Sequence, residues 1–276
     1  MKIIDGKALA AKIRAELKDK IKKSGKEVGL AVIIVGDDPA SCVYVRNKTK
    51  ACEETGIRSD TYALPATVSQ AELEALIARL GKDDRVHGIL LQLPLPEGLD
   101  AESALGKIPP EKDVDGFSAG NLGKLVLGKE TIAACTPLGI MKMLESAGIS
   151  PRGKHAVVLG RSETVGKPMA LLLLNADATV TICHSRTTNL KDICREADIL
   201  ISAVGKPKFV TEDMVKEGAV VIDVGINRNE AGKLCGDVDF EKVAPKTSWI
   251  TPVPGGVGPM TIATLLCNTF AAACKE

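Results

Sequence analysis

The chain has 276 residues, enough for one large domain or two modest ones. Hydrophobic residues make up 45% and charged residues 26%, as in ordinary globular proteins, and a net charge of +1 argues against a nucleic-acid partner. No apolar run reaches the ~18 residues of a membrane span, and the N-terminus lacks the apolar centre of a signal peptide. We therefore expect a cytoplasmic protein that binds neither nucleic acid nor membrane.

Short apolar runs rich in β-branched residues alternate along the chain with helix-like stretches. Runs that are apolar throughout are typical of strands buried on both faces of a parallel sheet. Six runs predict such strands: Gly29–Gly36, His87–Leu93, His155–Gly160, Ala178–Cys183, Asp198–Val204 and Ala219–Gly225. Because strands and helices alternate, the sequence predicts an α/β fold with parallel sheets.

Start and stop signals mark three of the predicted helices. A short polar residue before a proline suits a helix start, and a glycine suits a helix end. The signals are Asp38-Pro39 and Gly56 for the first helix, the capping box Ser69/Glu72 for the second, and Thr136-Pro137 and Gly148 for the third.

Two stretches suggest boundaries between two α/β units. Pro109–Thr131 is rich in glycine, proline and charge and has weak periodicity. Thr251–Pro259 precedes a final apolar helical segment, Met260–Cys274, which could return to the first unit. Such a return predicts two chain crossings and a cleft.

Cysteine and histidine give no support for a metal site. The eight cysteines are scattered without a C-x-x-C pair, and the three histidines lie far apart in the sequence. We expect the cysteines to be reduced and mostly buried thiols, and we predict no bound metal.

The turn after the third predicted strand resembles a phosphate-binding turn. Its pattern is G-x-S-x-x-x-G, with Gly160, Arg161, Ser162 and Gly166 leading into an apolar helix. Glycine permits close backbone approach, and free N–H groups at a helix start attract a pyrophosphate. The pattern departs from G-x-G-x-x-G, so alone it does not distinguish a dinucleotide site from an ordinary strand–helix turn.

The end of the next strand favours NADP over NAD. NAD sites usually carry an acidic residue there, which binds the ribose diol. Here Ser185 and Arg186 follow the strand, and Arg161 lies in the preceding turn. Arginine and a hydroxyl group suit a 2′-phosphate. The alternative is that both arginines are ordinary surface charges.

Tyr44 and Lys48 are four residues apart and share one helix face. Their helix begins beyond the carboxyl end of the first predicted strand, where α/β sheets bind ligands. The structural alternative is a solvated lysine beside a partly buried tyrosine. A short-chain dehydrogenase Y-x-x-x-K motif does not fit, because here the pair precedes the nucleotide turn by more than a hundred residues.

Three further polar residues fall at strand ends or turns of the same unit. Gln92 ends a predicted strand, while Asp113 and Asp115 stand in the boundary stretch before Gly116. Each alone is more typical of structure than of function. Together with Lys48 they predict a ligand site that combines an ammonium group, an amide and a carboxylate.

Seven sequence blocks together resemble the bifunctional methylenetetrahydrofolate dehydrogenase/cyclohydrolase family. They occur in the family's order and cover most of the chain: YVRNKTKACEETGI, GILLQLPLP, KDVDGFS, GRSETVGKPMALLLL, TVTICHSRT, VIDVGIN and TPVPGGVGPMTIATLL. The resemblance implies a homodimer with two domains and a folate cleft between them. A folate domain would span residues 1–136 and be completed by a C-terminal helix, 258–276, and a Rossmann-type NADP domain would span residues 137–257.

The resemblance also implies the reactions. A hydride would pass from 5,10-methylenetetrahydrofolate to NADP+, and water would then convert the methenyl product to 10-formyltetrahydrofolate. Lys48 would transfer protons, Gln92 would hydrogen-bond to it, Tyr44 would stack on the folate ring, and Asp115 would bind the ring's N–H groups. Lysine can exchange protons when its surroundings favour the neutral form, and a carboxylate suits a ring edge that presents several donors.

The cofactor residues follow from the same resemblance. Phosphates would contact Gly160, Arg161, Ser162 and Gly166, and the 2′-phosphate would face Arg161 and Ser185. Further contacts are implied for Arg186 and Ile226 with the cofactor, and for Pro254, Gly255 and Gly256 where nicotinamide meets folate. A rigid turn between domains is the structural alternative for the last three.

Two departures from the family pattern stand out. Ser118-Ala119 replaces a common His-Pro pair, and the polar pair Glu163-Thr164 replaces an aliphatic one, which could alter cofactor affinity. Two other functions stay open: another two-domain NADP oxidoreductase of the amino-acid or shikimate dehydrogenase type, and a nucleotide-binding sensor without catalysis.

Overall fold

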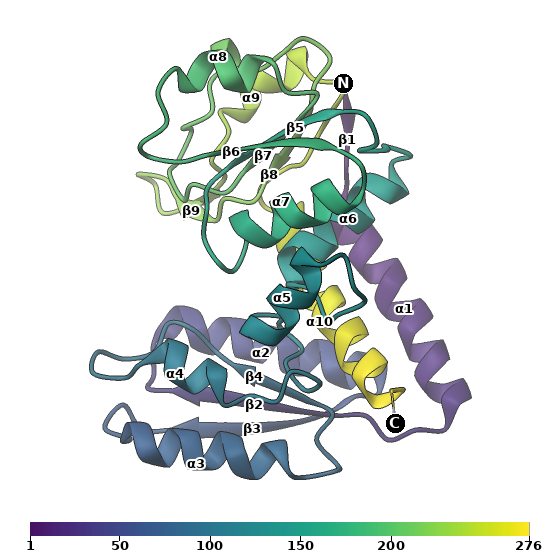
Figure 1. Cartoon of the computed structure of the whole chain (residues 1–276), viewed down its shortest axis with the longest axis vertical. Helices are drawn as coiled ribbons and strands as arrows, with labels where there is room; N and C mark the ends of the chain where they lie inside the picture. The colour runs from purple at the N-terminus through teal and green to yellow at the C-terminus, as the bar shows by residue number, and fades with distance from the viewer. Residues whose placement is uncertain (276) are drawn as a thin grey trace. The chain divides into compact units, whose positions relative to one another are not determined.

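The protein divides into two compact units, which the chain enters more than once. The structure, a computed structural model, describes residues 1–275 apart from the side chain of Ala40. Unit 1 contains Met1–Ala10 and Thr136–Thr261, and unit 2 contains Ala11–Cys135 and the chain from Ile262 onward. The chain therefore passes between the units at three places. Figure 1 shows the elements of each.

Unit 2 is built on a three-stranded parallel sheet. Its order is β3-β2-β4, with β2 (Gly29–Val35) in the centre. The other strands are β3 (Arg58–Leu64) and β4 (Gly88–Leu91). Four helices lie wholly in this unit: α2 (Pro39–Thr55), α3 (Gln70–Gly81), α4 (Ala101–Gly106) and α5 (Ala119–Val126). The unit also contains the larger parts of α1 (Gly6–Ser24) and α10 (Val257–Ala273).

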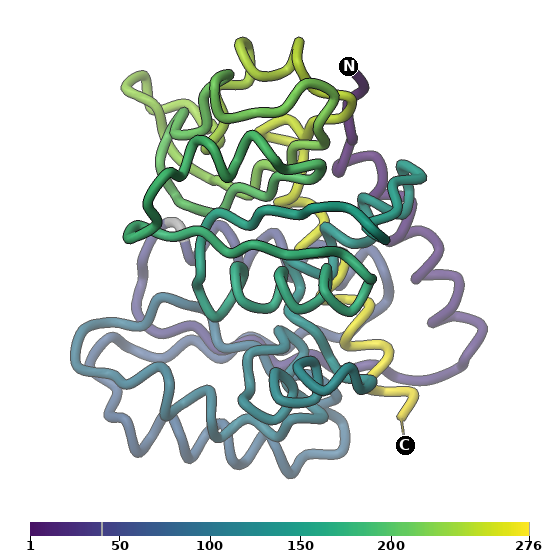
Figure 2. The backbone as a smooth tube through the Cα atoms, turned by 45° about the horizontal axis from the view of Figure 1, so that its top comes forward, coloured from purple at the N-terminus to yellow at the C-terminus, as the bar shows by residue number. Residues whose placement is uncertain are grey.

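Alternate residues of β2 face two separate hydrophobic cores, as the period of a strand requires. On one face Leu30, Val32 and Ile34 pack with α1, α2 and α10, and on the other Ala31, Ile33 and Val35 pack with α3. Figures 1 and 2 show α10 beside α1. A strand buried on both faces reads as a continuous apolar run, which is why it was predictable.

Strand β3, which lies at the edge of this sheet, was not predicted from the sequence. Its sequence, RSDTYAL, is polar, and none of its residues is fully buried. An edge strand of this kind lacks the apolar run that predicted the other strands.

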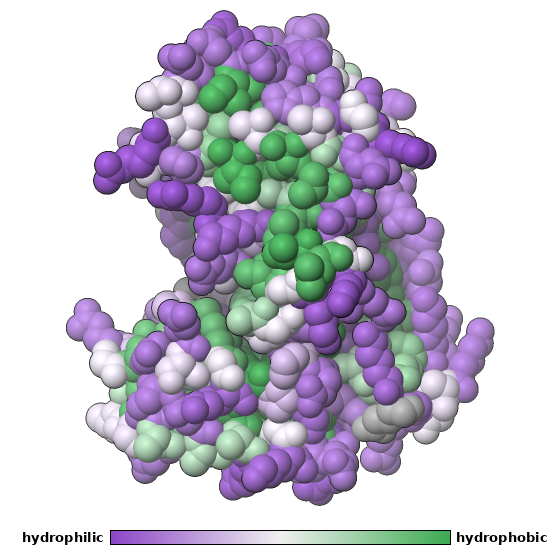
Figure 3. Space-filling view, in the orientation of Figure 1, coloured by the Kyte–Doolittle hydropathy of each residue, from purple (hydrophilic) through white to green (hydrophobic). Residues whose placement is uncertain are grey.

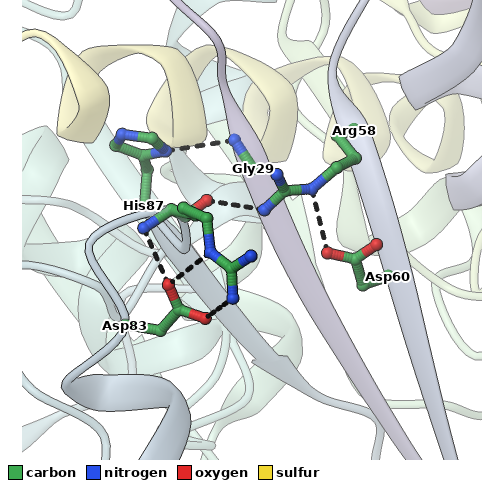
Figure 4. A network of polar contacts seen from close by, with 6 residues as sticks. Gly29, Arg58, Asp60, Asp83 and His87 are labelled. Carbon is green, nitrogen blue, oxygen red and sulfur yellow. Dashed lines mark hydrogen bonds and ion pairs between the residues drawn. The ribbon is translucent and has the colours of Figure 1, made fainter.

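Polar side chains fasten the amino end of the sheet in unit 2 (Figure 4). The Nη2 atom of Arg58 donates to the Arg85 carbonyl oxygen at 2.8 Å, where the Cβ of any larger residue at Gly29 would lie only 2.1 Å from the same oxygen. Further bonds join Arg58 to Asp60, Gly29 to His87, and Arg85 to Asp83. The amino ends of these strands are thus occupied by contacts within the protein, so we look for a ligand site at their carboxyl ends.

Unit 1 contains a six-stranded parallel sheet in the order β1-β11-β8-β7-β5-β6. The strand order reverses at β5, whose neighbours are β6 on one side and β7 on the other. The strands are β1 (Lys2–Ile3), β5 (His155–Leu159), β6 (Thr179–Cys183), β7 (Ile199–Ser202), β8 (Val220–Asp223) and β11 (Trp249–Ile250), and β9 (Asn227–Arg228) with β10 (Leu234–Cys235) forms a separate antiparallel pair.

Helices cover both faces of this sheet (Figure 1). Val157 and Leu159 of β5 face a core shared with α8 and α9, while α7 packs on β5 and β6. The helices of unit 1 are α6 (Cys135–Ser146), α7 (Gly166–Asn175), α8 (Leu190–Arg195) and α9 (Phe240–Val243), with short 3₁₀ turns at Glu212–Met214 and Ala244–Lys246. The predicted α/β fold with parallel sheets is confirmed.

Several predicted boundaries match the structure, and one predicted burial does not. Asp38 caps α2 by accepting from the Ser41 N–H at 2.8 Å, and Ser69 with Glu72 forms the capping box of α3. The expectation that every predicted strand is buried is wrong for β6, which is the sheet edge and is mostly exposed or half-buried. No helix among residues 1–275 is long and apolar enough to cross a bilayer.

Candidate active site

Lys48 and Gln92 meet at the carboxyl edge of the sheet in unit 2. Lys48 projects from α2 and is only 9% exposed. Its Nζ atom donates to Oε1 of Gln92 at 3.1 Å, and Gln92 directly follows β4. The Gln92 amide group donates to the Leu93 carbonyl oxygen at 2.7 Å. That second bond fixes the amide so that its oxygen, not its nitrogen, faces the lysine.

Tyr44 lies one helical turn before Lys48. In contrast to the lysine, its side chain is 40% exposed. The second turn of α2 therefore presents an aromatic ring to solvent near a buried ammonium group, an arrangement that can stack a flat ligand.

Asp113 folds the turn that carries Asp115. Asp113 is 2% exposed and accepts hydrogen bonds from three backbone N–H groups, at Gly116, Phe117 and Ser118, at 2.7 to 3.2 Å. The Asn121 side chain adds a fourth bond at 3.0 Å. Four donors occupy the lone pairs of one carboxylate, so Asp113 has a structural role in this turn.

Gly116 is required by this turn. Its φ of 75° lies in the left-handed region, and a Cβ atom there would approach the Ala133 carbonyl carbon to 2.5 Å. The turn is therefore pressed against the segment that leads to Cys135.

Asp115 is half-buried and electrostatically coupled to its neighbours. Desolvation raises its pKa, the Lys48 charge opposes this shift, and the Asp113 charge adds to it. The Cys135 thiol lies against the same carboxylate, and burial raises the pKa of that thiol well above its usual range. Lys48, Asp115 and Cys135 thus form one cluster, in which Cys135 is a neutral neighbour rather than a nucleophile.

Sequence reasoning missed the residue that fastens this cluster from the far end of the chain. The Asn268 side chain on α10 donates to the Val114 carbonyl oxygen at 2.9 Å and to the Ala133 carbonyl oxygen at 3.1 Å. Cys135 Sγ also donates to Val114 O. An asparagine in the apolar run LLCNTF was the available signal, because a buried amide needs partners.

Ser118, one of the departures from the family pattern, has a local role. Its hydroxyl oxygen accepts from the Asn121 N–H at 3.3 Å and caps α5. The cap explains why a serine suits this position.

The predicted phosphate turn in unit 1 depends on two glycines. A Cβ atom at Gly160 would lie 2.4 Å from the Ala203 carbonyl oxygen, and one at Gly166 would lie 2.2 Å from the Gly160 carbonyl oxygen. Ser162 Oγ accepts from the Val165 and Gly166 N–H groups and so shapes the turn. Within residues 1–275, nothing accepts from the N–H groups of residues 161–163. The turn fits the pyrophosphate of a dinucleotide.

The side chains predicted to bind a 2′-phosphate are all exposed. Arg161 follows β5, and Ser185 with Arg186 follows β6. Strands β5 and β6 pair in parallel, so their carboxyl ends are neighbours. His184 shapes the second loop by accepting from the Arg186 N–H at 3.1 Å. Two guanidinium groups and a hydroxyl group at this edge fit a phosphate monoester.

Glu163 places a negative charge in the phosphate turn and is paired. Its Oε1 atom lies 2.9 Å from Nζ of Lys167, one helical turn later. The pair is solvent-exposed, so Lys167 only partly offsets the repulsion that Glu163 would exert on a phosphate.

The PGG segment of unit 1 has a clear structural role. The Gly255 carbonyl oxygen accepts from the Lys7 N–H at 2.9 Å, and a Cβ atom at Gly6 would lie 1.9 Å from the Gly256 carbonyl oxygen. The segment is thus a rigid turn against the start of α1. Pro254 stays exposed, as does Ile226 on another loop of the same unit.

Of the eight cysteines, Cys52, Cys135, Cys183 and Cys194 are buried and Cys274 is exposed. Among residues 1–275, no group of three or more histidine, cysteine, aspartate or glutamate side chains is arranged to hold a metal ion.

Comparisons with known proteins identify the same organisation along the whole chain. The profile of the tetrahydrofolate dehydrogenase/cyclohydrolase catalytic domain matches residues 4–115, and the profile of its NAD(P)-binding domain matches residues 134–276. The bifunctional protein FolD of Moorella thermoacetica is 61% identical over 274 residues, which cover 98% of each chain.

Solved structures agree. The bifunctional FolD enzyme of Campylobacter jejuni superimposes with a TM-score of 0.98 at 55% identity over 99% of each chain. The Trypanosoma brucei FolD, solved with NADP cofactor and an inhibitor, gives a TM-score of 0.94 at 41% identity over 99% of this chain and 97% of that one. A shikimate dehydrogenase of Peptoclostridium difficile reaches a TM-score of 0.50 at 14% identity, which shows the fold alone.

The family alternatives left open by the sequence are thereby resolved, since the shikimate dehydrogenase likeness is distant and the folate-enzyme likeness spans both domains. With its catalytic and NAD(P)-binding domains in one chain, this protein belongs to the tetrahydrofolate dehydrogenase/cyclohydrolase family of enzymes.

Proposed function

We propose that the chain oxidises 5,10-methylenetetrahydrofolate to the 5,10-methenyl compound with NADP+ and then hydrolyses this product to 10-formyltetrahydrofolate. The observation that carries the proposal is the 3.1 Å bond between Lys48 and Gln92, in a cluster with Asp115. A buried amine held by an amide oxygen can move protons in a reaction that needs no metal.

Lys48 acts in the hydration. The methenyl carbon is already electrophilic, so water adds to it once a proton is taken from the attacking water. The carbon–nitrogen bond to N5 then breaks as N5 gains a proton. Gln92 holds the lysine Nζ atom through an oriented acceptor, which fixes where that proton exchange takes place.

Tyr44 and Asp115 bind the folate ring. The exposed Tyr44 ring offers a stacking surface, and the Asp115 carboxylate suits the pterin edge, which presents N–H and amino donors. The rigid turn made by Asp113 holds Asp115 in place.

NADP+ binds at the carboxyl edge of the sheet in unit 1, where its nicotinamide ring accepts the hydride. Gly160, Ser162 and Gly166 receive the phosphates, with Arg161, Ser185 and Arg186 at the 2′-phosphate. Ile226 and the segment Pro254–Gly256 are assigned to the nicotinamide end. We assign folate binding to residues 1–136 with 258–276, and cofactor binding to residues 137–257.

The chain acts as a cytoplasmic homodimer joined through the edge of unit 1. Edge strands offer unpaired backbone groups to a second chain. Ile182 of β6 is 41% exposed and Leu174 of α7 is 56% exposed, and Figure 3 shows hydrophobic side chains gathered over this region.

A lysine pair tests the catalytic proposal. In Lys48→Ala, hydration of methenyltetrahydrofolate should fall about 10²- to 10⁴-fold, while reduction of NADP+ with methylenetetrahydrofolate stays measurable. Lys50→Ala, an exposed lysine on the same helix, is the control. Equal loss of both activities and of folate binding would show that Lys48 only supports the fold of the site.

Sedimentation tests the dimer. Ile182→Lys should sediment as a monomer, whereas Leu234→Lys, which alters another exposed apolar residue of unit 1, should remain a dimer. A dimeric Ile182→Lys protein would exclude this interface.

A further inference from the structure

Two buried carboxylates lie together at the carboxyl edge of the sheet in unit 1. Asp223 is the last residue of β8, and Asp237 follows β10. Asp237 is 0% exposed, and Asp223 is nearly as deeply buried. Neither residue belongs to the sites described above, and sequence reasoning selected neither.

Asp237 is saturated with hydrogen bonds from two segments of the chain. A carboxylate offers about four lone-pair sites, yet five donors reach this one. They are Ser202 Oγ at 3.2 Å, the N–H groups of Val204 at 2.7 Å, Gly205 at 3.2 Å and Lys206 at 3.0 Å, and Asn227 Nδ2 at 2.9 Å. With no acceptor capacity left for a ligand, Asp237 can act only by holding protein groups in place.

Asp223 holds the neighbouring segment in the same manner. Its carboxylate accepts from the N–H groups of Gly225, Asp237 and Val238, each at 2.9 Å. Burial, with a contribution from the Asp237 charge, raises the pKa of Asp223 to about 6. Burying two carboxylates side by side is energetically unfavourable. Their presence therefore suggests that the loops they hold have a role.

The segment between these anchors presents an apolar side chain to solvent. Ile226 is 50% exposed, although the residue before it is bound to Asp223 and the residue after it is bound to Asp237. A side chain at Gly225 would lie 2.3 Å from Asp237 Oδ1, so the backbone cannot move away from the anchor without losing this packing. The chain thus holds an exposed isoleucine on a rigid support.

The place of this support in the sheet indicates its ligand. In doubly wound sheets a dinucleotide lies across the carboxyl ends of the strands, with its pyrophosphate at the first turn and its adenosine ribose toward the second strand. Here these are the turn after β5 and the strand β6. The other half of the cofactor therefore extends over β7 and β8, where the loops held by Asp237 and Asp223 begin.

We propose that Asp237 is a positioning residue for NADP+, which acts through Asn227 to hold Ile226 against the nicotinamide half of the cofactor. The inference rests on the proposed NADP+-dependent function. It assigns no chemical step to Asp237, because the carboxylate touches protein groups alone.

Two substitutions provide the test, each of which removes one side-chain hydrogen-bond donor to the Asp237 carboxylate. Asn227→Ala removes the bond on the Ile226 side, and Ser202→Ala removes a bond on the β7 side. In Asn227→Ala the KM for NADP+ and its Kd, from titration of the purified enzyme, should rise about tenfold, the usual effect of one bond to a charged group. In Ser202→Ala both constants should stay within about twofold of wild type.

Two further readouts separate the outcomes. Hydration of supplied methenyltetrahydrofolate needs no cofactor and should be unchanged in both variants, and the melting temperature reports a purely structural role. The inference would be overturned if the KM and Kd for NADP+ changed equally in the two variants. It would also be overturned if neither constant changed in either variant although the melting temperatures fell. Both outcomes would leave the proposed function standing. A wild-type enzyme that does not bind NADP+ in the titration would overturn both.

Discussion

The two candidate ligand regions of this protein differ in the groups that form them. In unit 2 the candidate site consists of buried charged and polar side chains, with Lys48 bonded to Gln92 and Asp113 bonded four times. In unit 1 the phosphate turn consists of glycine backbone with exposed Arg161, Ser185 and Arg186 around it. Proton transfer suits a side chain that is buried and held by an oriented hydrogen bond, whereas holding phosphates needs N–H groups and positive charge that can remain in water.

The largest effect is expected where a buried carboxylate holds a turn. Asp113→Ala would remove the carboxylate that accepts from three backbone N–H groups and from the Asn121 amide, and should lower the free energy of unfolding by about 3 kcal/mol. Urea titration measures this. Folate turnover should be lost while NADP+ binding by unit 1 is retained.

Asp84→Ala is the matched control for that variant, because Asp84 is an exposed aspartate of the same unit. It should change the free energy of unfolding by no more than about 0.5 kcal/mol. Loss of NADP+ binding together with folate turnover in Asp113→Ala would contradict the independence of the two regions.

Asp115→Asn should separate stability from function. The variant keeps the shape of the side chain but cannot accept two N–H donors as an anion, so kcat/KM for methylenetetrahydrofolate should fall about 100-fold. Because desolvation raises the pKa of Asp115, ionisation of this group costs stability in the folded protein. Its favourable contribution is complete below about pH 4 and is lost as pH rises through the raised pKa.

The melting temperature of Asp115→Asn should therefore exceed that of wild type at neutral pH, and the difference should shrink on acidification toward pH ~4. Parallel thermal melts across this range measure it. A difference that does not vary with pH would mean that the wild-type carboxylate is not destabilised by burial.

Arg161→Ala should affect only the exposed site. Loss of a guanidinium contact with the 2′-phosphate should lower kcat/KM for NADP+ by about 10- to 100-fold and leave kcat/KM for NAD+, which lacks this phosphate, unchanged. Arg152→Ala, an exposed arginine paired with Asp177, serves as control. An equal loss with both cofactors would place Arg161 on a group that NADP+ and NAD+ share.

The smallest effect is expected for Glu163→Gln. Removal of a negative charge from the phosphate turn should lower the KM for NADP+ about two- to threefold at low salt, and the gain should disappear as ionic strength rises. The exposed Glu163–Lys167 pair contributes little to stability, so the melting temperature should not change. A salt-independent change in KM would point to altered turn shape instead of charge.

Apolar strands could be predicted from the sequence, and polar or very short strands could not. Strands β2 and β7 are continuous apolar runs and were predictable, whereas polar β3 and the two-residue strands β1 and β11 gave no signal. The predicted burial of β6 was wrong because the alternation of helices and strands along the sequence does not distinguish an edge strand from a central one.

Side chains with ligand chemistry were easier to find than those that hold them. Lys48, Gln92 and Asp115 drew attention by their place at helix or strand ends and by family resemblance, and the structure brings the first two into contact. Asn268 acts on Val114 across 154 positions of the sequence, and Asp237 serves donors from separate loops. Such roles depend on which segments meet in space, and no local pattern encodes that.

The return of α10 to unit 2 has a consequence for biosynthesis. Leu265 and Leu266 belong to the same hydrophobic core as Val32, and Lys26 donates to the Ala273 carbonyl oxygen at 2.7 Å. On the ribosome, the sheet of unit 2 emerges first but its core stays open until all of unit 1 has been translated. The nascent chain therefore exposes an incomplete apolar surface for most of its synthesis, the kind of surface that chaperones bind.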